Sequence, residues 1–140
     1  MNEKKKKRSA GFTLVEVMVT MVIIGMLATI VVINVLPMIS KAKSEKARID
    51  INRLRQAVEY YNLDTNSFPE SLEDLLRAQP GSDNRARPEG YIESLPDDPW
   101  GNPYLYAYPG EYGRFDIWSY GADGTEGGEG NDADITSWQN

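Results

Sequence analysis

Cysteine and histidine are both absent from this chain of 140 residues. Without cysteine there is no disulfide, no thiolate nucleophile and no cysteine-ligated zinc or iron–sulfur centre. Without histidine the chain lacks the usual general base near neutral pH and the commonest ligand of transition metals. These absences exclude a triad hydrolase and a histidine-built metal site. They leave carboxylate chemistry and hard cations that prefer oxygen ligands.

Basic residues are scarce outside the first ten positions. The chain has 15 Lys and Arg against 21 Asp and Glu, a formal net charge of −6. Residues 1–10 carry four Lys, Arg8 and one Glu, which gives +4, whereas residues 41–140 carry 10 basic and 19 acidic side chains, which gives −9. Phosphate binding needs clustered Lys and Arg, so we expect no nucleic acid partner for this acidic body.

Charge is also missing from one long apolar segment. Between residues 12 and 40 the only charged side chain is Glu16. The uncharged core from Val17 to Ile33, with its flanks, reaches the roughly 20 residues needed to span a bilayer. The basic cluster before it should stay cytoplasmic, which places residues 41–140 across the membrane. The sequence therefore predicts a membrane helix over residues 12–39 and a globular domain over residues 40–140.

The small residues Ala10 and Gly11 precede the apolar segment, whereas an ordinary secretory signal has its small-residue cleavage site after it. A cut after Gly11 would leave the membrane helix on the product. It would also place a free amine on Phe12, one helical turn before Glu16. In a low dielectric the two charges would attract strongly and set the register between copies. The plain alternative is an uncleaved signal anchor.

The run from Gly11 to Glu16, with its basic leader and apolar helix, resembles the processing motif of type IV pilin-like proteins. The resemblance implies that a prepilin peptidase removes residues 1–11 as a leader peptide and methylates the new N-terminal Phe12. It also implies that the apolar helices pack into the core of a filament, with Glu16 acting in assembly.

Three further segments, residues 95–101, 119–124 and 133–135, resemble the major pseudopilin family of the type II secretion system. The resemblance implies a structural subunit, anchored once in the bacterial inner membrane with its C-terminal domain in the periplasm. Its implied partners are further copies, minor pseudopilins and the inner-membrane assembly platform. Such a subunit polymerises into a pseudopilus that drives export of folded proteins through the outer membrane.

Two other functions stay open at this point. A type IV pilus major pilin is the nearer alternative, although such pilins commonly close their C-terminal region with a disulfide. A membrane-anchored calcium-dependent enzyme or binding module is the other, and the acid pairs Asp97 with Asp98 and Asp132 with Asp134 could in principle serve as acid and base. Neighbouring acids in turns are usually solvated or bound to metal, so we expect no enzyme.

The globular part should be an α+β fold. A helical apolar stripe continues beyond Pro37, with Lys46, Asp50 and Arg53 among the charged residues placed off it, so one helix is predicted from Phe12 to about Asn62. A second short helix is expected from Ser71, a loop over residues 79–90, and strands over 104–108 and 115–120 joined by a turn at 109–113. The stripe consists of Ala47, Ile51, Leu54, Val58 and Tyr61.

The segment from residue 121 to 134 contains five Gly, five acidic residues and no basic one. Such a loop repels itself unless a cation neutralises it, and Ca²⁺ takes six to eight oxygen ligands from carboxylates and backbone carbonyls. Neither an EF-hand nor a single calcium β-roll repeat fits the spacing. The pseudopilin resemblance implies a Ca²⁺ site, with ligands from side chains of Asp123 and Asp134, Asp132 as the third carboxylate, and the carbonyls of Tyr120 and Thr125.

Overall fold

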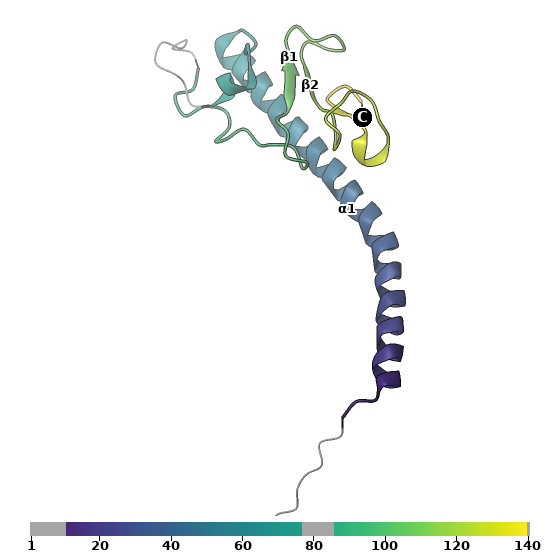
Figure 1. The fold of residues 1–140 in the computed structure, drawn as a ribbon. Coiled ribbons are helices and arrows are strands. Elements are labelled where there is room, and N and C mark those ends of the chain that lie inside the picture. The colour runs from purple at the N-terminus through teal and green to yellow at the C-terminus, as the bar shows by residue number, and fades with distance from the viewer. Residues whose placement is uncertain (1–10, 77–85, 140) are drawn as a thin grey trace, which may run out of the picture. The chain divides into compact units, whose positions relative to one another are not determined.

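The computed structural model describes residues 11–76 and 86–139. The chain divides into two compact units, Met1–Met38 and Ile39–Asn140. One helix, α1 (Leu14–Thr65), contributes residues to both units (Figure 1). It continues through Pro37, as predicted, although a proline inside a helix removes one backbone donor and crowds the carbonyl four residues earlier. It begins two residues later and ends three residues later than the sequence indicated.

The start of α1 has a cap that was not predicted from the sequence. The Thr13 hydroxyl accepts a hydrogen bond from the Glu16 backbone N–H at 3.2 Å. Thr13 therefore occupies the N-cap position and Glu16 the third helical position, which is the Thr-x-x-Glu pattern of a capping box. Glu16 also lies where the helix dipole favours a negative charge.

In the first unit, α1 presents apolar side chains on every side. Phe12 is 81% exposed and Met38 is 71% exposed, and the large apolar side chains between them are exposed as well. The few polar side chains bond to the helix itself, since Thr20, Thr29 and Asn34 each donate to the carbonyl four residues earlier, at 2.7–3.0 Å. A helix that satisfies its own polar groups in this way suits a medium without water.

In the second unit, the predicted apolar stripe of α1 forms the centre of the core. Its first four members are almost fully buried, and Tyr61 is half-buried. They pack against side chains from the segments that follow the helix. Those partners are Leu72, Leu75, Tyr104, Phe115, Ile117 and Ile135.

Asp50 was predicted to lie off the stripe, and this was wrong. It is only 6% exposed. One of its oxygens accepts a hydrogen bond from the Tyr104 hydroxyl at 3.2 Å and lies 2.7 Å from the Lys46 ammonium. A carboxylate can be buried when it is paired and hydrogen-bonded, and helix periodicity alone does not reveal such partners.

The sheet has three short antiparallel strands in the order β1-β2-β3. β1 (Leu105–Ala107) and β2 (Asp116–Ser119) lie inside the two predicted strand segments, and Figure 1 shows them beside the C-terminal part of α1. β3 (Ile135–Thr136) was not predicted, because two residues are too few for an alternation pattern. In the register, Trp118 lies opposite Leu105 on one side and Thr136 on the other.

The remaining elements are single turns. The helix expected from Ser71 is only a 3-10 turn, η1 (Leu72–Leu75), in which the Asp74 carboxylate accepts the Ser71 N–H at 3.0 Å. A second 3-10 turn, η2 (Gly130–Asp132), lies within the acidic loop. Of the loop predicted over residues 79–90, positions 79–85 lie outside the described residues.

Candidate functional site: the processed N-terminus and the C-terminal loop

Gly11 has no structural reason to be glycine. A Cβ atom built on it would meet nothing within 4 Å. The residue is exposed, as are Phe12 and Glu16 on either side of the helix start. A glycine that neither packing nor backbone conformation requires points to a constraint from outside the fold, such as a processing enzyme that must approach the chain closely.

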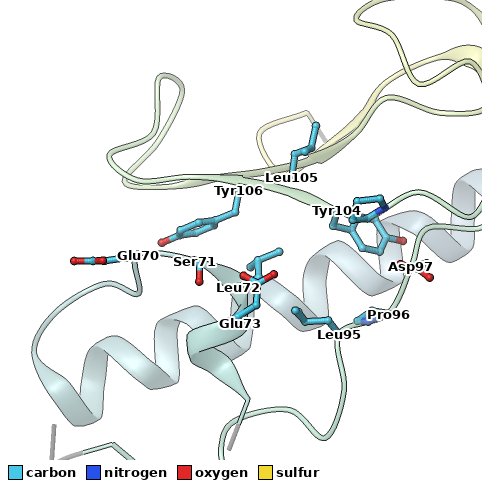
Figure 2. Close-up of a pocket in the computed structure, with 11 residues that line it drawn as sticks. Glu70, Ser71, Leu72, Glu73, Leu95, Pro96, Asp97, Tyr104, Leu105 and Tyr106 are labelled. Carbon is cyan, nitrogen blue, oxygen red and sulfur yellow. The ribbon is translucent and has the colours of Figure 1, made fainter. Parts of the chain in front are cut away.

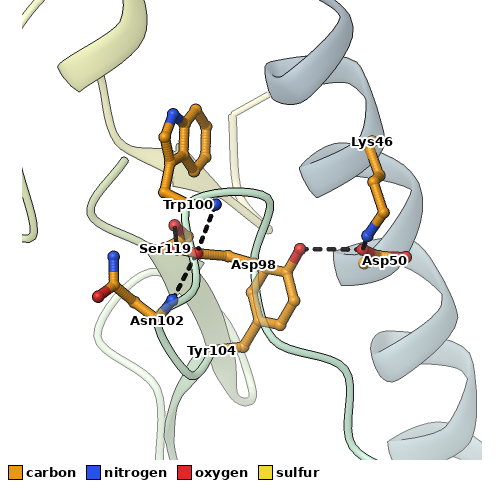
Figure 3. Close-up of polar contacts among 7 residues, drawn as sticks. All are labelled: Lys46, Asp50, Asp98, Trp100, Asn102, Tyr104 and Ser119. Carbon is orange, nitrogen blue, oxygen red and sulfur yellow. Dashed lines mark hydrogen bonds and ion pairs between the residues drawn. The ribbon is translucent and has the colours of Figure 1, made fainter. Parts of the chain in front are cut away.

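Asp98 organises the turn before the sheet (Figure 3). It is 4% exposed, and its Oδ1 accepts the backbone N–H groups of Trp100 at 3.0 Å and Asn102 at 2.8 Å. Its Oδ2 accepts the Ser119 hydroxyl at 2.6 Å. Ser119 in turn accepts the Gly121 N–H at 3.2 Å, so this buried carboxylate holds the first residue of the acidic loop.

Tyr104, just before β1, makes a further buried polar contact with Asp50 on α1 (Figure 3). Burial raises the pKa of the Tyr104 hydroxyl well above its usual range, and the neighbouring Asp50 carboxylate raises it further. Tyr104 therefore stays a neutral donor to Asp50 at physiological pH. It is a structural hydroxyl rather than an acid or base.

The pair Asp97 and Asp98 does not form an acid–base site. Asp97 is exposed and lines a pocket of about 220 Å³ between η1 and β1 (Figure 2). Asp98 is buried and does not line that pocket. Adjacent residues in this turn have their carboxylates in different environments, which argues against a shared catalytic role.

The two ends of the acidic loop are held close together. The Ala122 N–H donates to the Asn131 carbonyl at 3.1 Å. Gly121 has φ +73°, and a Cβ there would lie 2.9 Å from the Ala133 carbonyl oxygen, so both the conformation and the space require glycine. The Asn131 side chain adds two ties, because its Oδ1 accepts the Trp100 indole N–H at 3.0 Å and the Ser40 hydroxyl at 3.1 Å.

The predicted calcium ligands lie along this loop but do not form a cluster of carboxylates. Asp123 accepts the Thr125 N–H at 3.1 Å and the Thr125 hydroxyl at 2.9 Å, and Asp132 is exposed. Asp134 accepts the Gly127 N–H at 2.9 Å through Oδ2, while its Oδ1 is buried without a hydrogen-bond partner. Within residues 11–76 and 86–139, no three acidic side chains gather closely enough to hold a metal ion.

The residues present nevertheless suit a hard cation in one respect. A buried carboxylate oxygen without a donor is costly, and a bound cation would satisfy the orphaned Oδ1 of Asp134. All the implied side-chain ligands offer oxygen, which is what Ca²⁺ prefers. The calcium assignment stays a prediction.

Comparison with known proteins gives two family matches. A family model described as "Type II secretion system (T2SS), protein G" matches residues 34–138. A model described as "Prokaryotic N-terminal methylation motif" matches residues 6–32. Together they cover the processing motif, the helix apart from Ile33, and the whole of the second compact unit except its last residues.

Individual relatives agree. The chain is 43% identical to the type II secretion system core protein G of Pseudomonas aeruginosa, over 97% of this chain and 99% of that protein. It is 47% identical to the protein of the same name from Vibrio cholerae, over 96% and 95%. The crystal structure of the major pseudopilin from the type 2 secretion system of enterohaemorrhagic Escherichia coli superposes with a TM-score of 0.63 at 36% identity, covering 75% of this chain and 90% of that one.

These findings confirm the resemblance to major pseudopilins and the predicted pilin-like fold of a long helix on a small antiparallel sheet. The motif, together with a helix long and apolar enough to cross a bilayer, indicates a membrane-anchored protein. A sequence that matches this family model over most of its length, and its named members over nearly all of theirs, belongs to the protein G family of the type II secretion system.

Proposed function

We propose that this chain is the major structural subunit of the type II secretion pseudopilus. The exposed apolar surface over residues 12–39, whose polar side chains bond to the helix backbone, carries the proposal. Such a surface is stable only in a bilayer or against other apolar helices, and a filament subunit occupies both environments in turn. The names of the relatives, type II secretion system core protein G and major pseudopilin, support this reading.

The subunit would do mechanical work rather than chemistry. It is anchored once in the inner membrane with its second unit in the periplasm, and it polymerises with further copies and with minor pseudopilins on the assembly platform. Growth of the filament would then drive folded proteins through the outer membrane. The buried positions of Asp50, Asp98 and Tyr104 support a non-enzymatic role, since all three are engaged in structural hydrogen bonds.

Processing precedes assembly. A prepilin peptidase would cut between Gly11 and Phe12 and methylate the Phe12 amine. Residues 11–13 are exposed and lie outside α1, which supports this assignment, because a peptidase needs an accessible segment outside a helix.

Replacing Gly11 by valine should abolish this cleavage, since the branched side chain would crowd the peptidase while disturbing nothing in the fold. The measurement is the size and N-terminal residue of the membrane-extracted protein. Gly25→Val is the matched control, because Gly25 also has no neighbour within 4 Å but lies far from the cut. Normal trimming of Gly11→Val would contradict the proposed role of Gly11.

Glu16 has two candidate roles, which one pair of variants separates. The proposed role is a charge pair with the Phe12 amine of a neighbouring subunit. The other is to complete a capping box, in which the Glu16 side chain would accept the Thr13 N–H while the Thr13 hydroxyl accepts the Glu16 N–H, and glutamine can also do this. Both Glu16→Gln and Glu16→Ala should still insert and be cleaved, yet both should reduce filament cross-linking in cells to near background. If Glu16→Gln assembles like the wild type while Glu16→Ala fails, the charge pair is not needed and capping is the only role of Glu16.

For the acidic loop we propose a Ca²⁺ ion held by the side chains of Asp123, Asp132 and Asp134. The carbonyls of Tyr120 and Thr125 would complete the protein ligands. When bound, the ion would neutralise mutually repelling carboxylates and stiffen the loop on the filament surface. The pinned loop ends and the unpartnered Oδ1 of Asp134 support the proposal.

A further inference from the structure

The outer face of the three-stranded sheet has an unusual composition. Side chains alternate along β2, so that Ile117 and Ser119 point into the core and Asp116 and Trp118 to the other face. That second face lines a cavity of about 430 Å³. The cavity wall includes four aromatic side chains, Tyr112, Trp118, Tyr120 and Trp138.

The aromatic rings form a connected wall. Tyr112 and Trp138 are stacked, with ring centroids 4.4 Å apart and planes within 12°. Trp118 meets the edge or face of Trp138 at 6.2 Å and of Tyr120 at 6.2 Å. Aromatic faces attract cations through the ring quadrupole, and the attraction is stronger where water is excluded.

The same cavity has unpaired negative charge. Its acidic residues are Glu111, Asp116, Glu126 and Asp134, and no basic side chain is among the residues that line it. Asp116 is only 3% exposed. Its Oδ2 accepts the N–H groups of Glu111 and Tyr112, at 2.7 and 3.0 Å, while its Oδ1 is buried without a partner.

Unpartnered oxygens are concentrated here. The buried side-chain oxygens without a hydrogen bond in the described part of the chain belong to Asp116, Asp134 and Thr136, and all three residues line this one cavity. The Asp134 oxygen is already assigned to the proposed Ca²⁺ ion, which leaves those of Asp116 and Thr136 for a second ligand. A buried acceptor left unsatisfied is costly, and a donor from outside the chain would relieve that cost. The aromatic wall favours an organic cation over a bare metal ion, because a metal ion needs several oxygen ligands and gains little from ring faces.

We propose that this cavity, defined by Tyr112, Asp116, Trp118, Thr136 and Trp138, binds the guanidinium or ammonium group of a basic side chain from a second copy of this chain. The inference rests on the proposed function, since only a polymerising subunit meets other copies regularly. Because the cavity is acidic, the group that enters it should be a positively charged side chain that is exposed and unpaired on the other copy. Lys41, Arg48 and Arg53 are exposed on α1 and make no ion pair among the described residues, whereas Lys46 and Arg55 do. A contact between two different faces of one chain propagates head to tail, as a filament requires.

The first arm tests the chemistry of the pocket. The purified mature chain in detergent with saturating Ca²⁺ is titrated with N-acetyl-arginine amide, and tryptophan fluorescence reports binding. The neutral isostere N-acetyl-citrulline amide is the control and should bind at least about tenfold more weakly. Asp116→Asn should weaken arginine binding about tenfold as well. Tyr112→Leu, at a position 62% exposed and therefore safe for folding, should weaken it severalfold.

Two results would overturn the pocket. One is equal binding of the arginine and citrulline compounds, and the other is unchanged affinity in both Asp116→Asn and Tyr112→Leu. Glu73→Gln, an exposed acid at a different pocket, is the matched control and should change nothing. A parallel titration in EGTA in which the arginine compound binds more tightly would show competition with Ca²⁺ and would assign the cavity to the metal instead.

The second arm tests the source of the cation. N-acetyl-arginine amide should reduce chemical cross-linking between copies severalfold, and the citrulline compound should not. Binding without this competition would overturn the assignment to a second copy. Arg114 lines a neighbouring depression that shares Asp116, so Arg114→Gln is included. If the Arg114→Gln variant binds the arginine compound more tightly than the unmodified chain, Arg114 of the same chain already occupies the cavity, and the assignment to a second copy is overturned. If either arm fails while filament assembly still depends on Glu16, the cavity assignment is wrong and the proposed function is unaffected.

Discussion

Replacing Asp98 by alanine is expected to lower the free energy of unfolding of the second unit by about 3–5 kcal/mol. The substitution leaves the N–H groups of Trp100 and Asn102 and the hydroxyl of Ser119 without their buried acceptor. Hydrogen bonds to a charged group contribute about 1.5–3 kcal/mol each, and the losses are not fully additive. For a domain whose total stability is about 5–15 kcal/mol, this is a large fraction.

The measurement is thermal unfolding of a soluble fragment covering residues 39–140. The melting temperature should fall by more than about 10 °C. Asp97→Ala is the matched control, because this neighbouring acid is exposed, and it should change stability by no more than about 0.5 kcal/mol. Asp98→Asn keeps one acceptor oxygen and should lie between the two. Equal melting temperatures for the alanine variants at 97 and 98 would show that the buried carboxylate does not hold the turn.

Calcium should change the stability of the same fragment by a similar amount. An ion that binds only the folded state stabilises it by RT ln(1 + [Ca²⁺]/Kd), which is about 2.7 kcal/mol at a hundredfold excess over Kd. The fragment should therefore melt about 10 °C lower in EGTA than in millimolar Ca²⁺. Mg²⁺ should rescue poorly, because it demands octahedral geometry with shorter bonds and gives up its waters reluctantly.

Single substitutions then separate ligands from bystanders. Asp123→Ala and Asp134→Ala should each abolish the calcium-dependent shift. Glu126→Ala and Glu129→Ala remove the same charge from the same loop and should retain most of it, since neither is an implied ligand. In cells, the ligand variants should be degraded or assemble poorly, and secretion should fall. A melting temperature indifferent to both EGTA and Ca²⁺ would overturn the site.

The Asp98 and calcium experiments also inform each other. Asp98 holds Ser119, and Ser119 holds the N–H of Gly121 at the start of the acidic loop. Weakening this series of hydrogen bonds should weaken the binding of an ion by the loop. Asp98→Asn should therefore show a smaller calcium-dependent shift in melting temperature than the unmodified fragment. Asn131 holds the other end of the loop through Trp100 and Ser40, and Asn131→Ala should have the same effect by a separate route.

The sequence by itself determined the features that depend on short-range order. The processing motif, the apolar helix and the stripe from Ala47 to Val58 each follow from residue type and spacing along one element, and helix period and bilayer thickness fix their meaning. The two main strands could also be found, because turn residues separate them. The family resemblance rested on such local motifs, and the comparisons confirm it.

Only the tertiary structure decided where the acidic residues lie. Asp50, Asp98 and Asp116 look like solvated acids in the sequence, yet all three are buried. Their partners are the hydroxyl of Tyr104, the hydroxyl of Ser119 and the turn amides of Glu111 and Tyr112. For Asp50 and Asp98 those hydroxyls lie 54 and 21 positions away along the chain. A carboxylate becomes stable in the interior only through such donors, and no local period records contacts between distant segments.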